Sequence, residues 1–343
     1  MNLHFDKDAF ITVIQNVHKR TGLREDVLEK DYYVVLILRE LSQKQNGSDQ
    51  LPAYFKGGTA LYKALKTTNR FSEDIDISVD TRDCSRTQNE KRLRKATKEY
   101  TSLDRDLSES KNKTKQHEVI TAYTYEPFTS YDENDSLQRF GTVKIEATSF
   151  TISEPVEDLE IAPLIYDLGT SEQKAVLKDM YGVEPFYIKT MTLERIFIDK
   201  LFAAEAYFRK SNQDPKYPFE TAKHIYDLSV LEKHPKIVAL LSDEHKLKSL
   251  LDIRMQEEVN RLDGIPGVHP CEFTFFNAVL SCSAVRSAYG KMQDQYVLSD
   301  NYRIAFEDVA ESLARTQEKL WQNTVWKSYH LPKIATIDEE IEV

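Results

Sequence analysis

The feature that most constrains this chain is a glycine-rich turn followed at a fixed distance by two aspartates. Gly57–Thr59 comes directly after residues 53–56, a short segment typical of a strand. Asp74–Asp76 leads into a second segment, residues 75–79, whose strict alternation predicts a half-buried strand. Between the two, apolar residues recur at helical spacing over 59–66. The order strand, glycine turn, helix, strand predicts a compact α/β unit.

The two aspartates, Asp74 and Asp76, occupy alternate positions of the second strand. They should therefore project from one face, about 6.6 Å apart by the strand rise, while Ile75 and Ile77 enter the core. Adjacent carboxylates repel one another unless a cation lies between them, and ligands that are all oxygen favour Mg²⁺ over zinc. An Asp-x-Asp pair alone is more often just a polar strand face. The order of the whole unit favours a metal site.

Other residues extend this candidate site. Gly57 and Gly58 allow close backbone approach, and Thr59 opens a helix whose free N–H groups and dipole suit a phosphate. Glu146, on a strand expected over 142–150, is a third carboxylate of the kind that a two-metal phosphoryl-transfer site needs. The alternative is that Glu146 belongs to the solvent face of an edge strand.

Charge is unevenly distributed along the chain. Its 46 Lys and Arg residues against 56 Asp and Glu give a net charge of −10, which argues against indiscriminate binding of nucleic acid. Residues 82–98 are the exception, with seven positive and two negative side chains. Arg92, Arg94 and Lys95 in this basic segment are candidates to hold an RNA backbone. The alternative is an ordinary solvated helix face.

Composition also indicates the cellular compartment and the domain organisation of the chain. No run approaches the ~18 apolar residues of a membrane span, and the N-terminus lacks an apolar signal core. Three cysteines without metal spacing suit a reducing compartment, so we expect a cytoplasmic protein without a membrane partner. The pattern is mixed α/β up to about residue 190 and helical beyond it. We therefore expect two domains, 1–190 and 191–343.

Several of these segments resemble the AbiEii/AbiGii toxin family of nucleotidyltransferases. The match is most specific in the block from the glycine turn to the Asp-x-Asp, and it is supported by an upstream helix and by two downstream helical motifs. The matching segments are Glu29–Tyr32, Phe55–Leu61, Arg70–Ile77, Thr192–Glu194, Lys200–Ala203 and His224–Leu228.

The resemblance implies an α+β fold: a polymerase-β-like nucleotidyltransferase domain with a mixed sheet, followed by a helical C-terminal domain. It implies an Mg²⁺-dependent toxin of a toxin–antitoxin or phage-defence system, countered by an AbiEi-type antitoxin. Such a toxin transfers a nucleotide from an NTP to an RNA, with the tRNA 3′ end as the expected acceptor. By position, the expected catalytic residues are Asp74, Asp76, Glu146, Lys200 and Asp227; two Mg²⁺ ions would be held by Asp74, Asp76 and Glu146; and the nucleotide would be bound by Gly57, Gly58, Thr59, Arg70, Ser72 and Lys200.

The downstream residues are less certain from their pattern alone. Lys200 flanks the apolar stripe of its helix, so it could reach an interdomain cleft or simply extend along the surface to solvent. Asp227 could equally be an ordinary surface residue. The chain also has Lys223-His224 where the family commonly has Arg-Asp, which puts the geometry near Asp227 in doubt.

Two other functions remain open. A nucleotidyltransferase acting on a protein or small-molecule hydroxyl would keep the same site without needing the basic segment. A non-catalytic regulator that binds a nucleotide would lack metal-dependent turnover. Phosphate-loop, dinucleotide-binding, serine-hydrolase and zinc-hydrolase motifs are all absent from the sequence.

Overall fold

A computed structural model describes residues 2–48, 50–82, 84–115, 117–130, 140–260 and 268–328. An eight-stranded mixed sheet forms its centre, with strand order β3-β5-β6-β2-β1-β8-β7 and β4 paired to β5. The strands are β1 (Ala53–Lys56), β2 (Asp74–Val79), β3 (Asp104–Arg105), β4 (Lys113–Thr114), β5 (Glu118–Thr124), β6 (Thr142–Thr148), β7 (Val156–Ile161) and β8 (Phe186–Met191).

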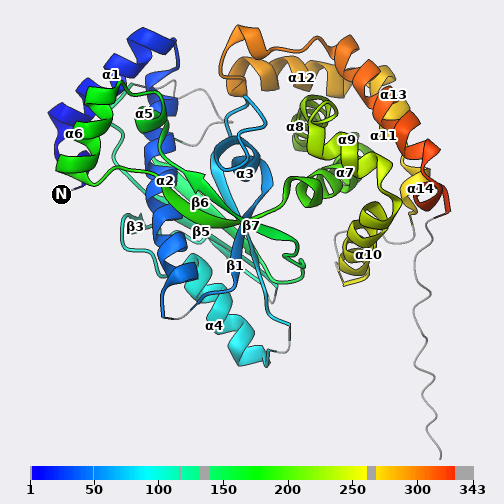
Figure 1. Cartoon of the computed structure of the whole chain (residues 1–343), viewed down its shortest axis with the longest axis horizontal. Helices are drawn as coiled ribbons and strands as arrows, with labels where there is room; N and C mark the ends of the chain where they lie inside the picture. Colours follow the sequence, from blue (N-terminus) through cyan, green and yellow to red (C-terminus); the bar gives the residue numbers. More distant parts are fainter. Residues whose placement is uncertain are drawn as a thin grey trace, which may run out of the picture.

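Helices surround the sheet and make up the C-terminal part of the chain. Figure 1 shows the sheet with α1–α6 on one side of the molecule and α7–α14 on the other. The helices are α1 (Lys7–Thr21), α2 (Glu25–Asn46), α3 (Gly57–Lys63), α4 (Arg86–Thr97), α5 (Leu164–Asp167), α6 (Ser171–Tyr181), α7 (Leu193–Arg209), α8 (Lys216–Leu231), α9 (Pro235–Ser242), α10 (Glu244–Asn260), α11 (Phe275–Ala278), α12 (Ser283–Tyr296), α13 (Phe306–Gln322) and α14 (Thr324–Ser328).

The central strand β2 has a different neighbour on each side. It runs antiparallel to β1, where Lys56 is paired with Asp76, and parallel to β6, where Asp76 is paired with Glu146. Paired residues of neighbouring strands project to the same face of a sheet. One face of the sheet therefore carries Lys56, Asp76 and Glu146 side by side.

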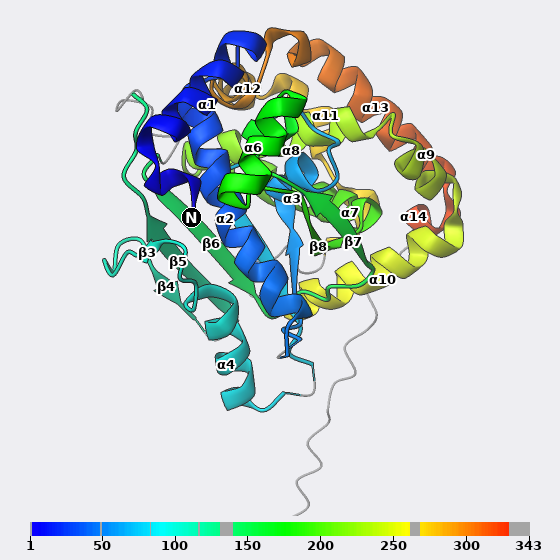
Figure 2. The ribbon, with the colours of Figure 1, turned by 60° about the vertical axis from the view of Figure 1, so that its left-hand side comes forward.

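The opposite face of the sheet is apolar and covered by helices. Ile75 and Ile145 are paired on it and are fully buried. Figure 2 shows α2 and α4 lying over this face. Tyr123, on the same face of β5, donates its hydroxyl to the backbone carbonyl of Thr97 in α4, at 2.8 Å. Burial of this face leaves the carboxylate face to meet α7 and α8.

The observed fold confirms the α+β prediction, a mixed sheet followed by a helical region. The bounds of one predicted helix were wrong. The helix predicted over 59–66 begins earlier, at Gly57, because Lys56 is its N-cap residue, and it ends at Lys63. The strand that carries Glu146, β6, lies between β2 and β5, so the alternative of an edge strand does not hold. The proposed division at residue 190 stays a prediction, and residues 329–343 of its second domain lie outside the described part.

Among the described residues, no helix is long and apolar enough to cross a membrane.

Candidate active site

The glycine turn and the second aspartate are in direct contact. Gly57 has φ +76°, in the left-handed region where a side chain is strained. A Cβ placed on it would lie 2.7 Å from Cγ and 2.9 Å from Cβ of Asp76, closer than atoms can pack. Glycine is therefore required at position 57 both by the backbone turn and by the carboxylate that lies against it.

Three carboxylates lie on the same face of two adjacent strands. Asp74 and Asp76 alternate along β2, and Glu146 of β6 is in register with Asp76. Burial, together with the charges of Glu146 and Asp74, raises the pKa of the Asp76 carboxyl to about 7. Glu146 forms an ion pair with Lys144, two residues before it on the same strand face. The site thus concentrates negative charge that needs cations.

The donor chemistry suits Mg²⁺, but the side chains do not converge fully on one point. Asp74, Asp76 and Glu146 offer only anionic oxygen, as a hard divalent cation prefers. Within the described residues, however, no group of three or more His, Cys, Asp or Glu side chains is arranged to hold a metal ion. Asp74 lines a different cavity from the other two carboxylates. The residue types fit the metal, and the three-ligand arrangement stays a prediction.

A cavity of about 450 Å³ opens over the carboxylate face. Asp76 and Glu146 lie on its sheet side with Gly57 and Gly58, and Lys200 of α7 lies on its helical side. A cavity of this volume is in the range that holds a small-molecule ligand. The structure therefore brings together the glycine turn, two carboxylates and a lysine that lies more than fifty positions beyond them.

A buried ion-pair network joins this cavity to the helical part. Asp227 of α8 accepts from Arg70 Nε at 3.0 Å and Nη2 at 2.8 Å, and its carboxylate lies 2.7 Å from Lys200 Nζ. Burial alone would raise the pKa of Asp227, but these two cations hold it well below its usual range. Neither Lys200 nor Asp227 is an ordinary surface residue, since their side chains are 7% and 0% exposed.

The predicted nucleotide-binding hydroxyls are arranged differently from the expectation. Thr59 is fully buried, and its hydroxyl donates to the backbone carbonyl of Asp74. It also lies 3.0 Å from the Ser72 hydroxyl. Thr59 therefore connects α3 to the start of β2 and does not reach the cavity. Ser72 lines the larger neighbouring cavity together with Arg70.

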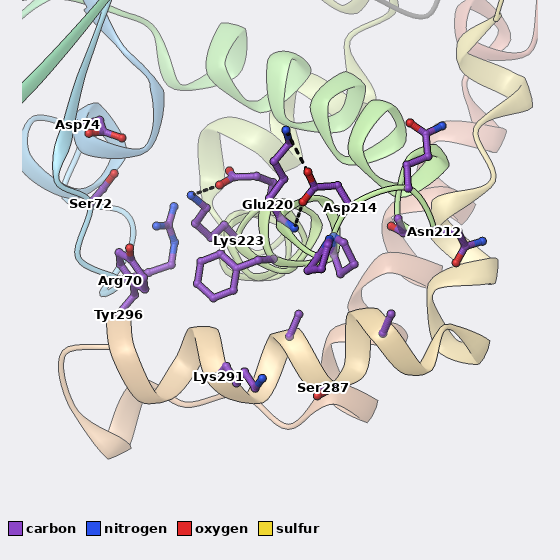
Figure 3. Close-up of a pocket in the computed structure, with 18 of the residues that line it drawn as sticks. Arg70, Ser72, Asp74, Asn212, Asp214, Glu220, Lys223, Ser287, Lys291 and Tyr296 are labelled. Atoms are coloured by element: carbon purple, nitrogen blue, oxygen red, sulfur yellow. Dashed lines mark hydrogen bonds and ion pairs between the residues drawn. The ribbon is translucent and has the colours of Figure 1, made fainter. Parts of the chain in front are cut away.

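This larger cavity, about 790 Å³, has Arg70 of the ion-pair network in its wall (Figure 3). Asp74 marks its sheet end, and the loop before α8 and helix α12 form its other walls. Two of its lysines are paired with acids: Lys223 lies 2.6 Å from Glu220, and Lys216 lies 3.4 Å from Asp214. The two aspartates of β2 thus face two different cavities.

The basic segment is remote from both cavities. Helix α4, which carries Arg92, Arg94 and Lys95, covers the apolar face of the sheet, opposite the carboxylates. Arg92 Nη1 donates to the Asp80 backbone carbonyl at 2.7 Å, and Arg94 pairs with Glu99 at 3.2 Å. The amphipathic helix turns its apolar side to the sheet, so these cations lie on the face away from the carboxylates, and their contact with RNA stays a prediction.

Sequence reasoning missed several cavity residues. Lys56, one position before the glycine turn, donates to Thr148 Oγ1 at 3.0 Å and lines the smaller cavity. Asp199 lies one position before Lys200, and Tyr207 and His224 complete the helical wall. Lys56 could have been proposed from the sequence, because it directly precedes the glycine turn. Its pairing with Asp76 is seen only in the structure. Tyr207 and His224 had no comparable signal in the sequence, because they come from different helices.

The glycine turn, paired strand carboxylates and buried lysine on an α+β sheet are the features of a nucleotidyltransferase. The chain belongs to the AbiEii family, described as the nucleotidyl transferase AbiEii toxin of type IV toxin–antitoxin systems, whose family model matches residues 37–312. The predicted family and enzyme class are thereby confirmed.

Among solved structures, the chain is similar to MenT4, the nucleotidyltransferase toxin Rv2826c from Mycobacterium tuberculosis H37Rv. The two are 15% identical, with a TM-score of 0.45, over 88% of this chain and 98% of that one. No curated protein sequence matches the chain.

Proposed function

We propose that this toxin transfers a nucleoside monophosphate from an NTP to the 3′ end of an RNA, with tRNA as the acceptor. The observation that carries the proposal is the smaller cavity, where the glycine turn, Asp76, Glu146 and Lys200 face one another. Its two carboxylates call for a divalent cation, and its lysine suits a polyphosphate. An NTP and a cation therefore match the charges of this cavity.

The reaction transfers one nucleotidyl group from the NTP to the acceptor hydroxyl. The oxygen of the acceptor hydroxyl attacks the α-phosphorus of the NTP, and the new P–O bond forms as the bond to the β-phosphate oxygen breaks. Pyrophosphate leaves with that electron pair, and the hydroxyl proton passes to the Glu146 carboxylate, as in general base catalysis. Lys200 neutralises the triphosphate, while Asp227 and Arg70 fix the position of Lys200.

Asp74, Asp76 and Glu146 would hold Mg²⁺, in keeping with the expectation of two ions. When bound, Mg²⁺ supplies Lewis-acid stabilisation of the phosphate oxygens and lowers the pKa of the attacking hydroxyl. The contribution of the chain is to keep these oxygens on adjacent, in-register strands. Gly57 contributes by leaving room for the Asp76 carboxylate.

The larger cavity supplies a place for the acceptor. Asp74 lies at its sheet end, and Asp76, two positions along β2, lies in the nucleotide cavity. An acceptor end in the larger cavity would therefore approach the NTP across the Asp-x-Asp strand. Because α4 lies on the far face of the sheet, we propose that the RNA acceptor end contacts this cavity rather than Arg92, Arg94 and Lys95.

The family also suggests a biological setting. A type IV toxin implies a partner antitoxin, which we propose to be of the AbiEi type. We further propose a cytoplasmic role in antiviral defence, since tRNA and NTPs are found in that compartment.

The test is incubation of the purified protein with total tRNA, Mg²⁺ and each labelled NTP in turn. Label on tRNA supports the proposal and identifies the nucleotide. Asp76→Asn should lower transfer at least about a hundredfold with the fold intact by circular dichroism. Asp158→Asn, at a strand aspartate that is 55% exposed and lines neither cavity, is the matched control and should retain activity.

Label on the protein itself, or on an added small-molecule alcohol, would contradict the RNA acceptor and identify a different hydroxyl substrate. Label on nothing, with all four NTPs, would contradict the proposed reaction.

A further inference from the structure

Two aromatic rings from different helices lie parallel to each other in the wall of the nucleotide cavity. Tyr207 of α7 and His224 of α8 have ring centroids 5.4 Å apart and planes inclined by 8°. Both residues line the cavity that contains Asp76 and Lys200. Tyr217, seven positions before His224 on α8, also stacks on Tyr207, at 6.1 Å and 30°, so the Tyr207 ring has an aromatic neighbour on each side.

We propose that the base of the NTP stacks on the ring of His224, which the Tyr207 ring supports from its other face. This inference rests on the proposed function, because it assigns the NTP to this cavity. Every nucleobase has a π-face, and base–aromatic stacking contributes substantially to nucleotide binding in proteins. The triphosphate of a nucleotide would contact the lysine, and the base at the other end of the nucleotide would contact an aromatic ring.

The spacing along α7 supports this assignment. Lys200 and Tyr207 are seven positions apart, so they project from nearly the same helix face, about 10 Å apart along the axis. Ala203, between them on that face, also lines the cavity and leaves space where a larger side chain would fill it. The triphosphate near Lys200, the ribose over Ala203 and the base on the rings would follow one helix face.

His224 adds a hydrogen-bonding group to this surface. Burial, with the Lys200 charge nearby, lowers the pKa of its imidazole well below the usual value, so the ring is neutral at physiological pH. A neutral imidazole has one donor and one acceptor nitrogen. Its Nδ1 is buried with no hydrogen-bond partner among the described residues. His224 is therefore suited to discriminate between bases, in addition to stacking on them.

The experiment measures equilibrium binding of each NTP, and of inorganic tripolyphosphate, by calorimetry in the presence of Mg²⁺. Tyr207→Ala and His224→Ala should each weaken NTP binding about tenfold. Tripolyphosphate binding should change less than twofold, because it has no base. His224→Asn should alter the ratio of affinities among the four NTPs, and Tyr207→Phe, which keeps the ring, should weaken NTP binding less than Tyr207→Ala does.

Tyr187→Ala, which removes a tyrosine that is 59% exposed on β8, is the control and should bind NTPs normally. If Tyr207→Ala unfolds, Tyr207→Leu keeps apolar volume without a ring and should show the same selective loss.

Three outcomes would overturn the assignment. Variants that bind every NTP as tightly as wild type would show that the rings do not contact the base. A change confined to the KM for tRNA would place the acceptor base on the rings instead. Wild-type protein that binds neither NTP nor tripolyphosphate would refute the nucleotide cavity itself, and with it the proposed function.

Discussion

The chain has two concentrations of positive charge that behave in opposite ways. In the basic segment, Arg86 and Arg94 have side chains 83% and 71% exposed and pair with nearby Glu90 and Glu99. In the buried ion-pair network, Arg70 and Lys200 have side chains 3% and 7% exposed and share the single carboxylate of Asp227. Each of the exposed cations lies close in sequence to its acidic partner, whereas Arg70 and its partner Asp227 are 157 positions apart.

The comparison shows what a count of charges along a sequence detects. The cations that cluster in this sequence lie on a surface helix, where they are solvated and paired with nearby acids, so each pair contributes little to stability. The cations that folding brings together, Arg70 and Lys200, lose their hydration and are both stabilised by the carboxylate of Asp227. The difference predicts a large cost for disrupting the buried network and a small one for disrupting the surface segment.

The largest effect should come from Asp227→Asn. Removing one member of a buried ion-pair network leaves Arg70 and Lys200 without their counter-charge, which typically costs about 3–5 kcal/mol in the free energy of unfolding. Urea denaturation measures this cost. Asp214→Asn, which breaks the exposed pair with Lys216, should cost less than about 1 kcal/mol. Equal urea midpoints for the Asp227→Asn variant and wild type would contradict the comparison.

The same residue should contribute to acid sensitivity. Because the pKa of Asp227 is depressed in the folded protein, its contribution to stability is complete above its unfolded pKa of about 3.9 and is lost as pH falls through the folded value. The stability difference between wild type and Asp227→Asn should therefore shrink below about pH 4. Urea midpoints at pH 7, 5 and 3 test this, and a difference that grows toward pH 3 would refute it.

A smaller effect on stability, with a large one on activity, is expected from Gly57→Ala. Gly57 and Gly182 both have positive φ, so alanine at either position should cost about 1–2 kcal/mol. A Cβ at Gly182 meets nothing within 4 Å, whereas one at Gly57 collides with Asp76. Transfer assays should therefore find Gly57→Ala inactive and Gly182→Ala active. Equal activity in the two variants would mean that the Asp76 position is unimportant.

The smallest effect should come from the combined variant Arg92→Ala, Arg94→Ala, Lys95→Ala. We expect the free energy of unfolding to change by less than about 1 kcal/mol, because these are surface charges. Transfer to RNA should fall less than about threefold and keep its salt dependence, because α4 lies on the far face of the sheet. A marked loss with a shallower salt dependence would return the RNA contact to this segment.

The elements nearest the glycine turn could be predicted because their patterns are local. Alternation in β2 identified the face that carries Asp74 and Asp76, and the order of elements identified the turn at Gly57. The family resemblance added Lys200 and Asp227, whose own pattern was equally consistent with a surface location. Their burial depends on packing of α7 against α8, which no local period records.

Other features depended on contacts that the sequence does not display. Thr59 is buried because its hydroxyl is used within the protein, and the side of the sheet that α4 covers is fixed only by tertiary packing. Tyr207 and His224 meet only because two helices lie side by side. Pairwise contacts between distant elements were therefore the main limit on predicting the site.

The register between β2 and β6 also sets when this enzyme can begin to work during its own synthesis. A ribosome that has synthesised the first 140 residues has made both aspartates of β2 but not Glu146, with which Asp76 is paired. Lys200 and Asp227 are translated later still, and Asp227 joins Arg70 across 157 positions. A chain that ends before residue 227 therefore contains no complete candidate site. The producing cell is exposed to activity only from molecules that extend past this residue, the form that an antitoxin has to neutralise.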